Sequence, residues 1–245
     1  MIELVGFDAD DTLWHSEGYF QQAHAAFERI IGGYIDLADA RLHERLLETE
    51  QRNLQLFGYG AKGMTLSMVE TAIALTEARI SASDIHRLVE LGKAVLQHPV
   101  ELLDGMREAV EAVAARWPVV MITKGDLFHQ ESKVARSGLA DLFGRIEIVS
   151  EKDAATYARV LREFDLPPER FAMVGNSLRS DIAPVLAAGG FGVHLPYHVT
   201  WAHELQAEVD IAHPRMAQVQ SASEIPAALA RLAEAHAQAV RVPSS

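Results

Sequence analysis

The run IELVGF at residues 2 to 7 is followed directly by DADDT at residues 8 to 12. An apolar run of this length, bounded by turn-favouring and helix-capping residue types, is typical of a buried strand. We therefore expect the chain to begin with a core strand whose carboxyl end carries Asp8 and Asp10.

The pattern changes to a helical period after this strand. Between residues 16 and 98, apolar residues recur at helical spacing, as at Phe20, Ala23 and Phe27, and no convincing strand is present. This pattern predicts a small all-helical domain over residues 16 to 98. The remaining core would consist of residues 1 to 15 and 99 to 245.

Strand-like runs then alternate with helical segments. The runs cover residues 119 to 123, 145 to 149, 171 to 175 and 190 to 195, and helices are expected near residues 106 to 116, 127 to 137, 154 to 164, 181 to 188 and 223 to 240. Strands separated by helices pair in parallel, because a parallel connection needs a crossover of about a dozen residues or more. The predicted fold class is therefore α/β, with a doubly wound parallel sheet.

Composition and charge narrow the class of function. The net charge of −12 disfavours nucleic acid as a partner, since an acidic surface repels phosphates. The chain has no cysteine, which excludes disulfides, thiolate catalysis and cysteine-ligated zinc. No apolar run approaches about 18 residues and no basic leader is present, so we expect a cytoplasmic protein without a membrane partner. The sequence does not predict the oligomeric state.

Chemically unusual residues follow the predicted strands. In an open parallel sheet, ligands bind beyond the carboxyl ends of the strands, so these positions are informative. The polar residues found there are Asp8, Asp10, Thr123, Lys124, Lys152, Asn176 and Asp181. Carboxylates hold a hard divalent cation, while a hydroxyl and ammonium groups neutralise phosphate oxygens. The set predicts phosphoryl transfer on a small phosphate ester.

These segments resemble the four motifs of the haloacid dehalogenase (HAD) superfamily of phosphatases. The first motif, Asp-x-Asp-x-Thr after an apolar strand, is similar to residues 8 to 12, and the second resembles the run that ends at Thr123. Lys152 matches the third, and GNSLRSD at residues 175 to 181 approximates the fourth. The resemblance covers residues 1 to 196 in the order of the family and implies a Rossmann-like core with a helical cap domain.

The resemblance implies a role for each matched residue. Asp8 would be the nucleophile that becomes an aspartyl phosphate, and Asp10 would be the general acid and then the general base. The residues implied to bind phosphate are Thr123, Lys124 and Lys152, and those implied to hold Mg2+ are Asp8, Asp10, Asn176 and Asp181. The implied activity is Mg2+-dependent hydrolysis of a small-molecule phosphomonoester.

Two positions depart from the pattern of the family. Asp11 stands where the family most often has glycine, which is a mild change because aspartate also tolerates tight turns. Asn176 stands where the family commonly has an acid, so Mg2+ affinity is expected to fall, or Asp181 to take a larger share of the metal. Lys133 competes with Lys152 for the third motif, but its place inside a predicted helix favours a surface position.

Other functions remain open. Dehalogenases of the family use the first aspartate to displace halide and lack the second carboxylate, so Asp10 speaks against that activity. A phosphomutase is not excluded, and Asn176 is the one feature that supports a non-catalytic protein that binds a phosphate ligand. In the insertion, residues 57 to 63 form a glycine-rich loop. Two interpretations of this loop are equally good: it simply connects two helices, or it contacts substrate through Tyr59 or Lys62.

Overall fold

The computed structural model describes residues 1 to 37, 41 to 198 and 209 to 241. The chain forms two compact units. The sheet unit consists of Met1–His15, Val100–Lys124 and Ser132–Ser245, and the helical unit consists of Ser16–Pro99 and Gly125–Glu131. The segment Gly125–Glu131 differs from the sequence prediction, which placed it in the core.

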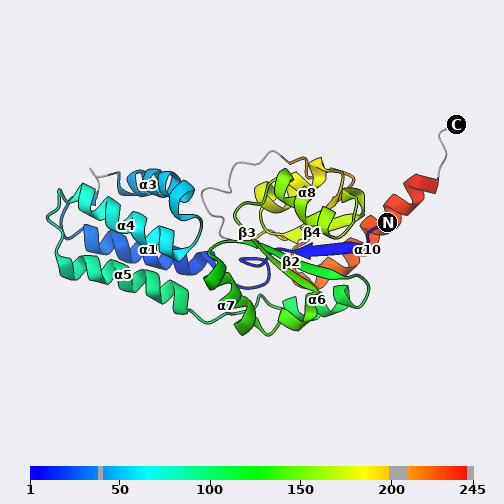
Figure 1. Cartoon of the computed structure of the whole chain (residues 1–245), viewed down its shortest axis with the longest axis horizontal. Coiled ribbons are helices and arrows are strands. Elements are labelled where there is room, and N and C mark those ends of the chain that lie inside the picture. The colour runs from blue at the N-terminus through cyan, green and yellow to red at the C-terminus, as the bar shows by residue number, and fades with distance from the viewer. Residues whose placement is uncertain (38–40, 199–208, 242–245) are drawn as a thin grey trace. The chain divides into compact units, whose positions relative to one another are not determined.

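The sheet unit is built on six parallel strands in the order β3-β2-β1-β4-β5-β6 (Figure 1). The strands are β1 (Leu4–Phe7), β2 (Val119–Lys124), β3 (Arg145–Val149), β4 (Phe171–Gly175), β5 (Phe191–His194) and β6 (Met216–Gln218). Because β1 lies between β2 and β4, the residues that follow it lie next to the ends of two other strands. The predicted α/β class with a parallel sheet is confirmed, and β6 is a strand that the sequence analysis missed.

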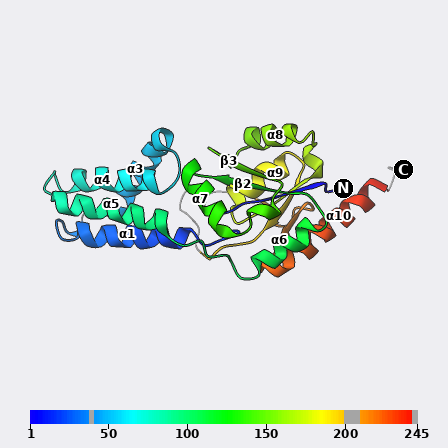
Figure 2. The same ribbon diagram turned by 60° about the horizontal axis from the view of Figure 1, so that its bottom comes forward.

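Side chains of the central strands alternate between two cores, as expected for strands buried on both faces. Phe7, Met121 and Val174 pack on one face with residues of α6 (Met106–Ala114) and α10 (Ile225–Arg241). Leu4, Val120 and Met173 pack on the other face with residues of α8 (Ala154–Glu163) and α9 (Ala183–Ala187). Figures 1 and 2 show α8 and α6 on opposite sides of the strands.

The helices of the sheet unit include α6 (Met106–Ala114), α8 (Ala154–Glu163), α9 (Ala183–Ala187) and α10 (Ile225–Arg241). Short turns of helix are η1 (Ala140–Leu142), η2 (Pro168–Arg170), η3 (Leu178–Ile182) and η5 (Ala222–Glu224). Helix α7 (Leu127–Ser137) begins in the helical unit and ends in the sheet unit. The predicted helix at 181 to 188 is divided in the structure, because its first turn is the π-helical η3 and only the remainder is α9.

The helical unit contains α1 (Glu17–Ile31), α3 (Leu42–Phe57), α4 (Ala61–Leu75) and α5 (Ala82–Gln97), which confirms the prediction of a helical insertion between the first two strands. Its apolar core includes Phe27, Met68 and Leu88. Among the residues that the structure describes, no helix has both the length and the apolar character needed to cross a bilayer.

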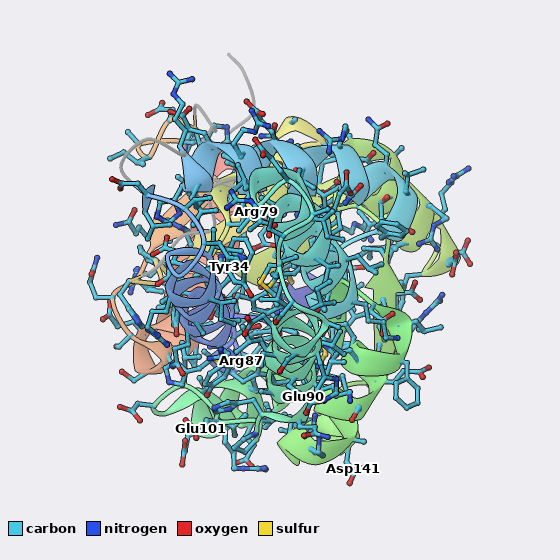
Figure 3. All side chains as sticks on the ribbon, turned by 90° about the vertical axis from the view of Figure 1, so that its left-hand side faces the viewer. Tyr34, Arg79, Arg87, Glu90, Glu101 and Asp141 are labelled. Atoms are coloured by element: carbon cyan, nitrogen blue, oxygen red, sulfur yellow. The ribbon has the colours of Figure 1, made fainter. Side chains whose placement is uncertain are left out.

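The start of α5 is fixed by a polar cluster around Asp84. The Ser81 side chain caps the helix by accepting a hydrogen bond from the backbone N–H of Asp84. Tyr34 and Arg87, both labelled in Figure 3, donate to the two carboxylate oxygens of Asp84 at 2.5 and 2.9 Å. The chain that leaves α1 is therefore tied to the first turn of α5.

Candidate active site

Asp8 lies directly after β1 and is buried. Its backbone N–H donates to the carbonyl of Val174 at 2.9 Å, which continues the pairing of β1 with β4 by one residue. Its carboxylate is bound on both sides: the Thr12 hydroxyl donates to Oδ2 at 3.0 Å, and the Lys152 ammonium donates to Oδ1. The fold thus brings three residues of the predicted motifs into contact at the carboxyl edge of the sheet.

The Lys152 ammonium lies between two buried carboxylates. Besides Asp8, it donates to Oδ1 of Asp181 at 2.8 Å, and all three side chains are buried. Burial alone would lower the pKa of Lys152, but the charges of Asp181 and Asp8 outweigh burial and raise this pKa above its usual value. Lys152 therefore stays positively charged.

One ammonium serves two carboxylates, so the buried group carries an excess of negative charge. Burial, together with the nearby charge of Asp181, raises the pKa of Asp8 to about 7 although Lys152 opposes the shift. A further positive charge next to Asp8 would relieve this excess. The electrostatics of the site therefore suit a bound cation.

Asp181 is placed by the wide π-helical turn of η3. The backbone N–H of Ser177 donates to Asp181 Oδ2 at 3.0 Å, while Oδ1 is bound by Lys152. Gly175 makes this possible, because a Cβ at that position would lie 2.2 Å from Asp181 Oδ2. Both carboxylate oxygens of Asp181 are therefore already engaged by groups of the protein.

Asn176 meets Asp8 through a shared hydroxyl group. The Thr12 Oγ1 atom lies 3.2 Å from Asn176 Oδ1, and it also accepts a hydrogen bond from the Asn176 backbone N–H at 3.0 Å. The backbone carbonyl oxygen of Asn176 is 3.0 Å from Nε2 of His194 on β5. The side-chain oxygens of Asp8 and Asn176 thus converge, and both are hard donors of the kind that Mg2+ prefers.

Asp10 is held by contacts of its own. Its Oδ1 atom accepts a hydrogen bond from the Trp14 indole at 2.6 Å, and Lys133 Nζ lies 2.5 Å from Oδ1 and 2.7 Å from Oδ2. The surface position predicted for Lys133 is wrong, because this lysine is buried against the carboxylate. Sequence spacing gave no signal for the pair, which joins residues 123 positions apart.

The chain turns sharply between Asp10 and Trp14. Asp11 adopts a left-handed conformation with φ of 61°, and its N–H donates to the Trp14 carbonyl at 2.7 Å. This conformation explains why glycine serves well at the position and why aspartate, which enters this region more readily than most residues, is accepted. The turn also brings the indole back to the Asp10 carboxylate.

Thr123 and Lys124 end β2 at the same edge of the sheet. Thr123 is buried, and the Lys124 ammonium donates to the Ser180 hydroxyl at 3.0 Å and lies 3.6 Å from the Glu151 carboxylate. Phosphate binding by Thr123 and Lys124 stays a prediction.

Lys62 and Tyr59 belong to the helical unit. Gly58 and Gly60 flank Tyr59 with φ values of 69° and 114°, a backbone conformation that favours glycine. The Lys62 ammonium lies 2.9 Å from both oxygens of Asp126 and 5.7 Å from the ring centre of Phe128, in the segment that the sequence analysis had assigned to the core. A substrate contact by Lys62 or Tyr59 stays a prediction.

Parallel strands that bring an aspartate, a lysine and a hydroxyl group together at their carboxyl ends form a Rossmann-like core with a charged site at the edge of the sheet. The family model described as haloacid dehalogenase-like hydrolase matches residues 2–189, and the chain belongs to this family. Its structure is similar to that of a haloacid dehalogenase-like family hydrolase from Xanthomonas campestris, which is 60% identical, with 97% of this chain and 99% of the other covered and a TM-score of 0.88.

Two more distant structures share the fold. A 2-haloacid dehalogenase from Pseudomonas syringae is 23% identical, with 94% of this chain and 99% of the other covered and a TM-score of 0.62. A HAD-hydrolase from Bacillus subtilis bound to magnesium is 19% identical, with 91% and 96% covered and a TM-score of 0.57. A comparison with curated proteins found no match.

Proposed function

We propose that this hydrolase is a Mg2+-dependent phosphomonoester hydrolase that acts on a small phosphorylated metabolite through an aspartyl phosphate on Asp8. The observation that carries the proposal is a pair of carboxylates two positions apart in different surroundings. Asp8 is buried against Lys152 and Thr12, whereas the Asp10 side chain is 31% exposed and is held by other partners. An alkoxide leaving group needs a proton and a halide does not, so the second carboxylate favours phosphate-ester cleavage over dehalogenation.

The chemistry has two steps in this proposal. The Asp8 carboxylate forms a bond to phosphorus while the bond from phosphorus to the ester oxygen breaks, and that oxygen takes a proton from Asp10. Asp10 then accepts a proton from water as the water oxygen attacks the aspartyl phosphate, which releases inorganic phosphate and restores Asp8. Lys152, Lys124 and Thr123 bind the phosphate oxygens and oppose their charge.

A magnesium site fits the residues present. Among the described residues no group of three or more His, Cys, Asp or Glu side chains could hold a metal, so the ion would depend on amide and carbonyl oxygens as well. The donors we assign are Asp8, the Asp10 carbonyl and Asn176, because the Asn176 side-chain oxygen and an Asp8 carboxylate oxygen both contact the Thr12 hydroxyl. Asp181, which binds Lys152 and Ser177, is the alternative donor. When bound, Mg2+ supplies the positive charge that a single ammonium does not provide next to Asp8. The relative from Bacillus subtilis that is bound to magnesium supports Mg2+ as the cofactor.

A panel of phosphomonoesters, assayed with Mg2+ and after its removal by EDTA, tests the proposal. We expect release of inorganic phosphate that depends on Mg2+. Chloride release from 2-chloropropionate would instead identify a dehalogenase, and phosphate transfer between sugar hydroxyl groups without release would identify a mutase. Binding of phosphate esters without any turnover would identify a non-catalytic protein.

Asn176→Asp is expected to increase the affinity for Mg2+ about tenfold, because a carboxylate replaces a neutral amide among the metal ligands. The measurement is the Mg2+ concentration that gives half-maximal activity. Asn176→Ala should raise this concentration by a similar factor. If Asp181→Asn weakens Mg2+ binding more than Asn176→Ala does, Asp181 and not Asn176 is the ligand.

Lys62→Ala is expected to raise KM about three- to fivefold with little change in kcat, the size appropriate to an exposed charged contact with substrate. Lys93→Ala is a matched control in the same unit, because both lysine side chains are 52% exposed and each is paired with an acidic residue. Equal KM values for the two variants across several phosphate esters would show that Lys62 does not contact substrate.

A further inference from the structure

The contacts of Asp10 are unusual for a carboxylate that must exchange protons with substrate. Lys133 contributes a buried ammonium from α7, with 9% of its side chain exposed, and this ammonium reaches both oxygens of Asp10. Trp14 is fully buried and directs its indole N–H at one of the same oxygens. Two residues far apart in the sequence therefore bind one carboxylate.

Neither contact is an ordinary surface interaction. A buried ammonium is costly unless it is paired, and the indole of a buried tryptophan has a single N–H donor that needs an acceptor. Both requirements are met here by the Asp10 carboxylate. Because the two donors approach from different segments, they fix both the position of the carboxylate and its rotation about the last side-chain bond.

We propose that Lys133 and Trp14 are positioning residues that hold the Asp10 carboxylate in place for proton transfer to and from substrate, an inference that rests on the proposed function of Asp10. An aspartate side chain without these donors can turn among several rotamers. Proton transfer requires hydrogen-bond distance to the leaving oxygen, and a displacement of about 1 Å costs about 100-fold in rate. Lys133 and Trp14 thus act through Asp10 and do not themselves touch substrate.

The dependence of the rate on the leaving group distinguishes a role in positioning Asp10 from a role in the stability of the fold. The 4-nitrophenolate ion departs readily without a proton, whereas phenolate and alkoxides gain from protonation as the bond breaks. Loss of the Asp10 position should therefore slow phenyl phosphate much more than 4-nitrophenyl phosphate. The quantity to compare is kcat/KM, because it reports the steps up to formation of the aspartyl phosphate.

For Lys133→Met we expect kcat/KM to fall about 100-fold for phenyl phosphate and less than about fivefold for 4-nitrophenyl phosphate. Trp14→Phe removes one donor and should give the same selectivity with a smaller loss, about tenfold for phenyl phosphate. Lys133→Arg retains the charge and should recover most of the activity on phenyl phosphate. Lys93→Met is the control for loss of an ammonium group and should leave kcat/KM unchanged for both substrates.

Melting temperatures of all variants show which of them fold. If Lys133→Met does not fold, Trp14→Phe still carries the test, because it retains the Lys133 contact with Asp10. Equal losses on the two substrates, or no loss on either, in folded Lys133→Met or folded Trp14→Phe would overturn the positioning role.

Asp10→Asn distinguishes failure of the inference from failure of the proposed function. If Asp10→Asn loses activity selectively on phenyl phosphate while the Lys133 and Trp14 variants do not, the positioning role is overturned and Asp10 remains the acid. If Asp10→Asn shows no selective loss, Asp10 is not the acid and both proposals fall. A selective loss in all three sets of variants supports both.

Discussion

Asp8→Asn is expected to lower the turnover of 4-nitrophenyl phosphate by about 10,000-fold or more while the protein stays folded. An amide oxygen does not form the acyl phosphate, so the first step is lost. The substitution should be tolerated structurally, because burial already raises the pKa of Asp8 to about 7 and a neutral side chain suits the site. Thr12 can still donate to an amide oxygen, and Lys152 keeps Asp181 as a partner.

The control for this variant is Asp141→Asn, which alters an exposed aspartate of the same unit (Figure 3). It should have the activity of the unmodified protein. Steady-state turnover and the melting temperature are the two measurements. Mg2+-dependent turnover that survives in Asp8→Asn at more than trace level would contradict nucleophilic attack by Asp8.

Lys152→Met is expected to reduce the free energy of unfolding by about 3 to 5 kcal/mol and to abolish turnover. The substitution leaves Asp8 and Asp181 buried together without their shared ammonium. The expected loss is large because an uncompensated buried charge costs more than the original ion pair contributes. Denaturant unfolding measures the first effect and phosphate release the second.

The pH dependence of this loss has a definite sign. The raised pKa of Lys152 means that its stabilisation is fully present at neutral pH in the unmodified protein and is lost only as the pH rises through the folded-state pKa. In the variant Asp8 loses the ammonium that opposes its raised pKa, so this pKa rises further and the Asp8 carboxyl group reduces the cost of its burial by taking up a proton. Since the pKa of Asp8 is already about 7, the destabilisation should shrink as the pH falls from about 8 to about 5.

Two further variants control the Lys152 experiment. Lys93→Met removes an exposed ammonium and should change the free energy of unfolding very little. Lys152→Met combined with Asp181→Asn removes one of the two buried carboxylates that have lost their ammonium partner, and should recover part of the free energy of unfolding. If the double variant is no more stable than Lys152→Met alone, the loss does not arise from unpaired carboxylates.

The main strands and helices could be predicted because their signals are local. Apolar runs of strand length marked β1 to β5, and helical periodicity located α6, α7, α8 and α10 to within a few residues. The strand β6 (Met216–Gln218) gave no such signal, since it is three residues long and only its first residue is buried. Its pairing with β5 depends on tertiary contacts that no local pattern records.

The same distinction applies to the site. Asp8 and Lys152 were located from their places at strand ends, and the fold brings them into contact. Lys133 was misplaced because helical spacing describes a side chain within its own helix and says nothing of a carboxylate far away in the sequence. A buried ion pair between distant segments becomes visible only when the packing is known.

The central place of β1 has a consequence for synthesis of the protein. One neighbour of β1, β2, lies near the middle of the chain and the other, β4, follows about 50 residues later, and the Thr12 contact with Asn176 joins residues 164 positions apart. At roughly 5 to 20 residues per second, a ribosome would need about 10 to 30 s to add the intervening residues. Until β2 has been made the apolar first strand has neither partner, and until β4 has been made it has only one. Asp8 can therefore acquire its chemistry only after most of the protein has been made.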